Sequence, residues 1–409
     1  MKILHTGDWH LGKRLDFFSR LEEQKEVLDE ICHIADQEQV DAVIVAGDLF
    51  DAYNPPVEAI ELLYKTLRRL TNGGKRPVIA IAGNHDSADR IDAPDVLARE
   101  CGILFIGYPN AKLNTLQIEN GFSITQTDHG FVEIQLPQYN YPLRVLTTPF
   151  ANEWRLKQFL GIEDKEQQLQ EVLRQRWQAL TDTYCDEQGV NMLTAHLYML
   201  QRGGEVLEEP EGEKPLKIGN ADIVYSDNIP RQIQYTALGH LHRFIPIAGH
   251  AAPVIYASSP LAYSFSEAGQ QKYVVVVDAV PNHQVSCERV ALTSGRPLHR
   301  KRFVQIDEAV SWLHDNPNAL VELTLVSDTY LTSMDLKRIH EAHDGIIHII
   351  PVVKQDTASS TMATNSINLD QDIQQLFLDY FRYRTGQEAN TEIIDLLHEV
   401  IYHESEEED

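Results

Sequence analysis

Five short segments of this chain carry side chains that can bind metal ions. They are Asp8-x-His10, Gly47-Asp48-x-x-Asp51, Gly83-Asn84-His85-Asp86, His196 and Gly239-His240-x-His242, and each follows an apolar run. Carboxylate oxygen, amide oxygen and imidazole nitrogen together suit borderline ions such as manganese, iron or zinc better than magnesium alone. The pattern therefore predicts a metal site.

The candidate ligands are too many for one ion. There are seven of them: Asp8, His10, Asp48, Asn84, His196, His240 and His242. Two divalent ions about 3.5 to 4 Å apart, the arrangement used for phosphoester hydrolysis, would accommodate them. Asp48 is the natural anionic bridge between the two ions. Asp8 and His10 lie two residues apart, so in an extended segment both side chains would point the same way and reach one ion.

His85 and two aspartates have supporting roles in this interpretation. His85 is placed to donate a proton to the leaving oxygen, although it could instead only orient a ligand. Asp51 and Asp86 would hold histidines or turn the chain around the ligands. Taken alone, residues 82–86 could be only a turn that caps a helix, and Asp8-x-His10 an ordinary turn after a strand. The recurrence of such residues after five apolar runs favours the metal site.

The elements that must position these residues belong to an α/β fold. Apolar runs at 41–46 and 78–81 predict strands buried on both faces, and helices are expected at 19–38 and 57–70. This order predicts right-handed crossovers and a largely parallel sheet with the candidate ligands at its carboxyl edge. Further predictions are antiparallel strands around an Asn120-Gly121 turn within 113–136, a helix at 165–184, and strands at 192–195, 255–265 and 272–278.

Composition limits the function classes. The chain has 409 residues, a formal net charge of −26 and 43% hydrophobic residues, which is ordinary for a globular protein except for its acidity. Such a charge argues against general attraction to nucleic acid, but two divalent ions against Asp8 and Asp48 would keep the pocket positive for a phosphate. The four cysteines show no zinc or disulfide spacing. With no membrane-length apolar run and no signal peptide, a cytoplasmic protein is expected.

The C-terminal part divides into smaller pieces. A polar, basic stretch at 294–302 predicts a domain boundary, and 303–353 reads as a small α/β module in which His340 and His343 are expected at the surface. Residues 355–368 are expected to be a linker without periodicity. Two amphipathic helices, at 369–383 and 391–403, then precede an acidic tail. They have no evident domain to pack on, which favours docking to a partner.

The five segments resemble the signature of the calcineurin-like metallophosphoesterase superfamily in order and spacing. A narrower resemblance is to the SbcD family, the nuclease subunits of bacterial SbcCD complexes. It rests on His5-Thr6, Trp9-His10-Leu11-Gly12, the Val45 to Asp51 run with Pro55-Pro56, and Ala237-Leu-Gly-His-Leu-His-Arg243. Two departures exist: Gly7 replaces a Ser or Ala, and Ser258-Ser259-Pro260 replaces Gly-Ser-Pro.

This resemblance implies a metallophosphoesterase-type β-sandwich flanked by helices at 1–295, a small α/β capping domain at 296–354, a linker, and a helical pair at 369–409 that binds an SbcC-like coiled-coil ATPase. It implies two ions, manganese above all, one held by Asp8, His10, Asp48 and His242 and the other by Asp48, Asn84, His196 and His240. The implied activity is duplex-end exonuclease and single-strand or hairpin endonuclease in DNA repair and recombination, by a homodimer within a heterotetramer. The alternatives are a phosphatase or phosphodiesterase of the same superfamily and a non-catalytic DNA-end scaffold.

Overall fold

The computed structural model describes residues 1–158, 165–207, 223–327 and 331–353, together with 376–378, 381 and 394. The chain divides into two compact units, Met1–Val352 and Val353–Asp409. In the second unit, residues 376–378, 381 and 394 are helical. The predicted linker, and otherwise the predicted C-terminal helices, lie outside the described residues.

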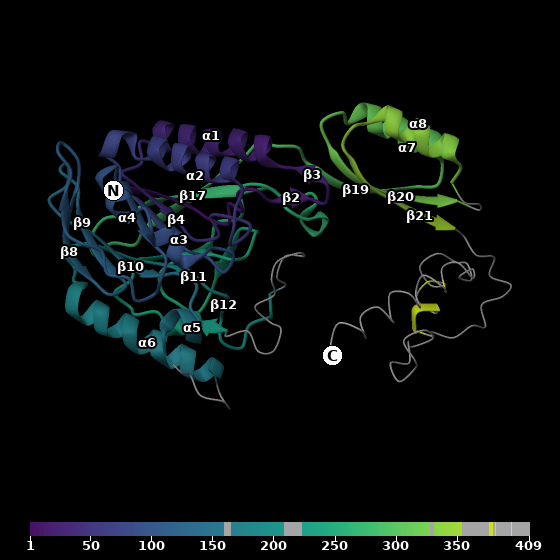
Figure 1. Cartoon of the computed structure of the whole chain (residues 1–409). Helices are drawn as coiled ribbons and strands as arrows, with labels where there is room; N and C mark the ends of the chain where they lie inside the picture. Colours follow the sequence, from purple (N-terminus) through teal and green to yellow (C-terminus); the bar gives the residue numbers. More distant parts are fainter. Residues whose placement is uncertain are drawn as a thin grey trace, which may run out of the picture. The chain divides into compact units, whose positions relative to one another are not determined.

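A six-stranded sheet forms one half of the first unit (Figure 1). Its strand order is β18-β17-β1-β4-β5-β6. The strands are β1 (Lys2–Thr6), β4 (Ala42–Val45), β5 (Val78–Ile81), β6 (Ile103–Ile106), β17 (Tyr273–Asp278) and β18 (Ser286–Ala291). β1, β4, β5 and β6 are parallel, as predicted, and β17 and β18 close one edge antiparallel.

A second sheet of eight strands packs against the first. Its order is β15-β16-β14-β11-β10-β9-β8-β7. The strands are β7 (Leu116–Gln117), β8 (Ser123–Asp128), β9 (Phe131–Gln135), β10 (Leu143–Thr148), β11 (Val190–His196), β14 (Tyr235–Gly239), β15 (Ile245–Ile247) and β16 (Val254–Tyr256). β7, β8 and β9 are antiparallel neighbours, which confirms the prediction for 113–136.

Strand alternation explains the layers. Ile3 on β1 faces a core shared with Val145 and Met192 of the second sheet, whereas Leu4 faces the core under helices α1 (Leu21–Gln37) and α2 (Val57–Leu70). Helix α6 (Lys165–Tyr184) covers the outer face of the second sheet. Figure 1 shows α1 and α2 side by side and α6 on the opposite side of the sheets. The predicted α/β sandwich flanked by helices is therefore confirmed.

The small α/β module has the predicted element order, but its first strand begins at Leu298, inside the stretch that was predicted as the domain boundary. It consists of β19 (Leu298–Phe303), α7 (Ile306–Asp315), β20 (Leu320–Ser327), α8 (Ser333–Ala342) and β21 (Ile346–Val353). Its three strands and two helices enclose a core of their own. The prediction for His343 was wrong: it is buried, because its imidazole bonds the carbonyl of Asn316 at 2.9 Å and the N–H of Gly345 at 2.9 Å.

The predicted strand at 255–265 was also wrong in part. Strand β16 ends at Tyr256, because Ser258 adopts a φ of +123°, which an extended strand does not allow. The chain then forms a short 3₁₀ turn, η3 (Phe265–Glu267), with a Ser264/Glu267 capping box.

The remaining short elements lie in the connections. They are β2 (Arg14–Leu15), β3 (Phe18–Ser19), η1 (Asn72–Gly74), α3 (Ala88–Asp92), α4 (Asp95–Glu100), α5 (Glu153–Leu156), β12 (Met199–Leu200), β13 (Val224–Tyr225) and η2 (Ser226–Asn228). None of the helices in the described part of the chain combines the length and the apolar character that a membrane crossing needs. All four cysteines lie in the described part and none forms a disulfide.

Candidate metal centre

All seven candidate ligands lie at the carboxyl ends of strands from both sheets. Asp8 and His10 follow β1, Asp48 follows β4, Asn84 follows β5, His196 ends β11, and His240 and His242 follow β14. Each of these side chains is buried. Carboxyl ends of neighbouring parallel strands share one edge, so the facing sheets together bring the residues into one cluster.

Left-handed backbone turns, and not extended chain, direct the first ligands. Asp8, His10 and Asp48 have φ values of +52°, +45° and +47°. The expectation that Asp8 and His10 point together because they alternate along an extended segment is therefore wrong, since β1 ends at Thr6. Such φ values are uncommon for residues other than glycine, and strain of this kind concentrates at functional sites.

Glycines let the strand ends approach one another. A Cβ on Gly83 would lie 2.0 Å from Oδ1 of Asp48, and a Cβ on Gly47 would lie 2.2 Å from Nδ1 of His196. A Cβ on Gly239 would lie 1.8 Å from the carbonyl oxygen of Ala46. The Gly-Asp, Gly-Asn and Gly-His pairs in the sequence are thus explained by close packing around the cluster.

Asp48 lies between two groups of ligand atoms. Its Oδ2 is 3.2 Å from Nε2 of His196 and 3.6 Å from Nε2 of His10. On the His196 side, Asn84 Oδ1 is 2.8 Å from Nε2 of His196, and the Asp8 carboxylate is 3.7 Å from its Nδ1. On the His10 side, the Nε2 atoms of His10 and His242 are 3.0 Å apart.

Two compact sets of possible ligands result. One comprises Asp8, Asp48 and His196, and the other comprises His10, Asp51 and His85. In each set the ligand atoms lie within 4.8 Å of one another. His240 joins the first set through its backbone N–H, which donates to Asp8 Oδ1 at 2.8 Å, and its ring centroid is 5.6 Å from that of His196.

The pKa values of Asp8, Asp48 and His196 indicate that the cluster stabilises positive charge. Burial raises the pKa of Asp8 to about 7, and the Asp48 carboxylate adds to the rise. Burial alone would lower the pKa of His196, but the carboxylates of Asp48 and Asp8 outweigh it and raise this pKa to about 9. His196 in turn lowers the pKa of Asp48 against the effect of burial. A proton on the imidazole thus compensates buried negative charge that a metal cation would compensate directly.

The donor set fits divalent metal ions. The seven candidate ligands offer carboxylate and amide oxygens and imidazole nitrogens, all of them buried, and Oδ2 of Asp48 lies near both His196 and His10. Oxygen and nitrogen ligands of this mixture suit manganese, iron and zinc. The two groups therefore suit two ions with Asp48 between them.

Asn84 and His85 face different ways. Asn84 contacts His196, whereas Nδ1 of His85 donates to the carbonyl of Asp51 at 2.7 Å. The His85 ring stands edge-on to the ring of His10, with centroids 4.8 Å apart. Since the carbonyl can only accept, Nδ1 carries a hydrogen, and proton transfer by this ring would use Nε2.

Asp86 and Asp51 support the two loops in different ways. The Asp86 carboxylate accepts N–H groups from Gly83, Leu49 and Phe50 at 2.8, 3.0 and 2.9 Å, so it joins the ends of β4 and β5. Asp51 lies 3.7 Å from Nδ1 of His10 and 2.9 Å from Nζ of Lys13. Against the effect of burial, these two partners lower the pKa of Asp51 to about 2.

Three supporting residues are not identified as such by any pattern in the sequence. Arg155 on α5 donates to the carbonyls of Gly83 at 2.8 Å and Asp86 at 2.6 Å. Glu267 lies 3.4 Å from Nδ1 of His242, and Lys272 lies 2.5 Å from Glu267. The capping-box pattern Ser264-x-x-Glu267 was visible in the sequence, but nothing in the spacing connected it with His242.

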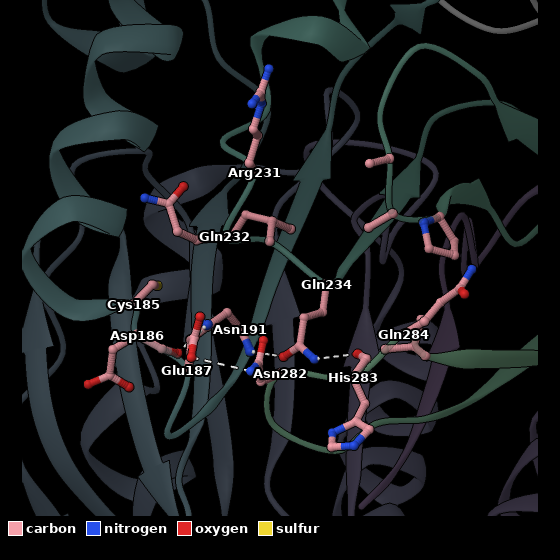
Figure 2. A pocket seen from close by; sticks show the side chains of 15 residues that line it. Cys185, Asp186, Glu187, Asn191, Arg231, Gln232, Gln234, Asn282, His283 and Gln284 are labelled. Carbon is pink, nitrogen blue, oxygen red and sulfur yellow. Dashed lines mark hydrogen bonds between the residues drawn. The ribbon is translucent and has the colours of Figure 1, made fainter.

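A cavity of about 710 Å³ lies elsewhere, near the starts of β11 and β14 (Figure 2). Its polar groups bond to one another: Gln234 Nε2 donates to the carbonyl of His283 at 2.8 Å, and Asn282 donates to Glu187 at 3.2 Å. At about 3.3 Å per residue, Asn191 in its lining is about 16 Å along β11 from His196. This cavity is separate from the histidine cluster.

Comparison with known proteins places the same residues in a family context. The calcineurin-like phosphoesterase family matches residues 1–243. The chain is 37% identical over 362 residues to a Bacillus subtilis protein named as the D subunit of the nuclease SbcCD, covering 87% of this chain and 86% of that protein. Proteins of the same name from Staphylococcus epidermidis and Rhodobacter capsulatus are 30% and 32% identical, over 83% and 69% of this chain and 83% and 68% of theirs.

Proposed function

Because the chain belongs to the calcineurin-like phosphoesterase family and is a metal-dependent nuclease, we propose that it acts as the D subunit of an SbcCD-type complex on the phosphodiester bonds of DNA. The resemblance to the SbcD family is confirmed by relatives that match most of the chain. The observation that carries the proposal is the burial of five strand ends in one cluster at Asp48. The proposed substrates are duplex ends, single strands and hairpins, in DNA repair and recombination.

The protein binds divalent metal, and we assign the ligands as two sets. As the family resemblance implies, Asp8, His10, Asp48 and His242 would hold one ion, and Asp48, Asn84, His196 and His240 the other. In this structure the Asp8 carboxylate lies with Asp48 and His196, so its assignment to the His10 ion rests on that resemblance. Manganese is the proposed metal for both. When bound, the ions supply charge neutralisation for the phosphate and a lowered pKa for a water nucleophile.

The residues of the chain then have distinct roles. Asp48 holds both halves of the cluster together, and its Oδ1 accepts the backbone N–H of His85 at 2.9 Å. Because Nδ1 of His85 donates to the Asp51 carbonyl, the proposed proton donor to the leaving 3′ or 5′ oxygen is Nε2–H of the doubly protonated imidazolium form of this ring. Asp86 and Arg155 fix the loop that carries Asn84 and His85.

The test uses the full chain with its SbcC-type partner, ATP and Mn²⁺. His85→Gln should abolish cleavage of linear and hairpin DNA while Mn²⁺ binding, measured by calorimetry, persists. Asp48→Ala should lose both. Unchanged cleavage in both variants would revive the non-catalytic scaffold, and hydrolysis of a bis-aryl phosphodiester without any DNA cleavage would favour the small-molecule phosphodiesterase.

We further propose that the segment at 369–403 binds the coiled coil of the SbcC-type ATPase and that 296–354 forms a capping domain. The amphipathic pattern of this segment supports the first assignment, and the separate core of the module supports the second. Deleting 369–403 should abolish co-elution with the partner in gel filtration while bis-aryl phosphodiesterase activity remains. Retained co-elution would place the partner site elsewhere.

A homodimer is the proposed arrangement within a heterotetramer. We take as its surface an apolar groove of about 470 Å³ between α2 and α4, lined among others by Tyr64, Pro94 and Leu97. Leu97 is 75% exposed and the neighbouring Val96 is 73% exposed. Leu97→Glu should halve the mass measured by light scattering. An unchanged mass would exclude this surface.

A further inference from the structure

A buried ion pair between Glu267 of the turn η3 and Lys272, directly before β17, touches a candidate ligand. Oε2 of Glu267 lies 2.5 Å from Nζ of Lys272, and Oε1 lies 3.4 Å from Nδ1 of His242. Both side chains are nearly inaccessible, with 3% of Glu267 and 6% of Lys272 exposed. Lys272 also donates to the backbone carbonyl of His242 at 2.6 Å and to Oγ of Ser259 at 3.1 Å. The pair therefore holds His242 at both its ring and its backbone.

The carboxylate of Glu267 is itself held in place. Its Oε1 accepts the backbone N–H groups of Tyr263 at 3.1 Å and Ser264 at 3.2 Å. On the other side of the turn, Phe265 is buried among Leu298, Leu320 and Ile347 of the small module. Rotation of the carboxylate away from His242 would break several of these contacts at once.

This geometry has a chemical consequence for His242. A carboxylate beside Nδ1 favours the tautomer with the hydrogen on that nitrogen, which leaves the lone pair on Nε2. Nε2 is the nitrogen that faces Nε2 of His10 at 3.0 Å, inside the proposed ligand set. A buried ion pair adds little net stability compared with apolar side chains of similar volume. The presence of this pair is therefore better explained by its contacts with His242 than by a contribution to stability.

We propose that Glu267, held by Lys272, is a positioning residue for the nuclease reaction: it orients the His242 imidazole and fixes its tautomer so that Nε2 is presented to the metal. The proposal rests on the proposed assignment of His242 as a ligand. Glu267 does not reach the reacting atoms and acts through His242 alone.

The test compares three variants of the full chain. Glu267→Gln/Lys272→Met removes both charges together, so no unpaired buried charge remains. His242→Ala reports on the ligand assignment. Glu133→Gln/Arg144→Met is the matched control, because that pair is also buried, at 2.8 Å, but lies on β9 and β10 away from the ligands. Calorimetry measures Mn²⁺ affinity, and ¹⁵N imidazole spectra of the metal-free protein report tautomers, with the His242 signal identified by its absence in His242→Ala.

The expected result is a loss of Mn²⁺ affinity of about tenfold or more in Glu267→Gln/Lys272→Met, a loss of the pure Nδ1–H signal of His242, and wild-type values in the control. If His242→Ala binds Mn²⁺ normally, the ligand assignment fails. If His242→Ala loses affinity while Glu267→Gln/Lys272→Met keeps both affinity and tautomer, the positioning role is overturned. Should this double variant not fold, Glu267→Leu/Lys272→Met, which also leaves no unpaired buried charge, is measured against the same two criteria.

Discussion

The imidazole of His5 joins the two sheets through the hydroxyl of Tyr235. Nδ1 of His5 on β1 lies 2.8 Å from the Tyr235 oxygen at the start of β14, and Nε2 lies 3.1 Å from the carbonyl of Leu238. The carbonyl requires a hydrogen on Nε2, so Nδ1 accepts the hydroxyl hydrogen and the ring is neutral. Burial lowers the pKa of His5 to about 3, and the bond to Leu238 offsets this only in part.

His5 should therefore make the fold sensitive to acid. The unfolded chain binds a proton at this position with a pKa of about 6.5, whereas the folded chain does not until about pH 3, so stability is complete above pH 6.5 and falls as the pH drops. Between pH 7 and pH 5 the loss from this residue is about 2 kcal/mol. Urea denaturation of the wild type and His5→Gln at both pH values measures it. Parallel losses in the two proteins would contradict the prediction.

Two glycines that follow strands of the six-stranded sheet, Gly7 after β1 and Gly83 after β5, should respond differently to replacement by alanine. A Cβ on Gly83 would meet Asp48 Oδ1 at 2.0 Å, whereas a Cβ on Gly7 would lie 3.3 Å from the Cβ of Ala46. Gly83→Ala must displace Asp48 and should lower Mn²⁺ affinity at least tenfold, an estimate typical of disturbed ligand support. Gly7→Ala is the control and should bind Mn²⁺ normally. Calorimetry measures the Mn²⁺ affinity of both variants. Equal affinities would contradict the prediction that close packing at Gly83 positions Asp48.

The sequence predicted which residues meet, and the reason was topological. Apolar runs buried on both faces could only be strands of a covered sheet, and parallel strands bring their carboxyl ends to one edge, so Asp8, Asp48 and Asn84 had to lie together. The backbone conformation that directs these side chains into the site could not be predicted in the same way. Asp8 and His10 reach the site through left-handed φ values. Only glycine makes such values predictable from the residue type.

Residues outside the motifs that hydrogen-bond to the ligand loops could not be predicted from the sequence, for a different reason. Arg155 acts by donating to the carbonyls of Gly83 and Asp86, and every residue has a carbonyl, so no sequence pattern identifies the partners. His343 was misjudged because helical spacing placed it beside His340, while its actual bonds are to the loop carbonyl of Asn316 and to Gly345.

Arg155 should matter for turnover because one guanidinium bridges two carbonyls of the loop that carries Asn84 and His85. Lysine has a compact ammonium and cannot reproduce this fork. Arg155→Lys is expected to lower kcat about tenfold and the melting temperature by a few degrees. Arg176→Lys is the control, since Arg176 also donates to a backbone carbonyl, that of Pro109, in a loop that carries none of the candidate ligands. A normal kcat in Arg155→Lys would show that the loop with Asn84 and His85 keeps its conformation without the two guanidinium hydrogen bonds.

Manganese binding should release protons at neutral pH. Without metal, the pKa of His196 is raised to about 9 by the Asp48 and Asp8 carboxylates against burial, and burial raises that of Asp8 to about 7. Ligation needs neutral imidazole and ionised carboxylate, so at pH 7.5 about one proton must leave, chiefly from His196. Affinity should accordingly rise with pH between about 6 and 9. Calorimetry in Tris and in HEPES counts the protons from the difference in heat, with His5→Gln as a control that should release the same number. A binding heat independent of buffer, together with an affinity that stays constant over this pH range, would mean that His196 is already neutral before the metal arrives.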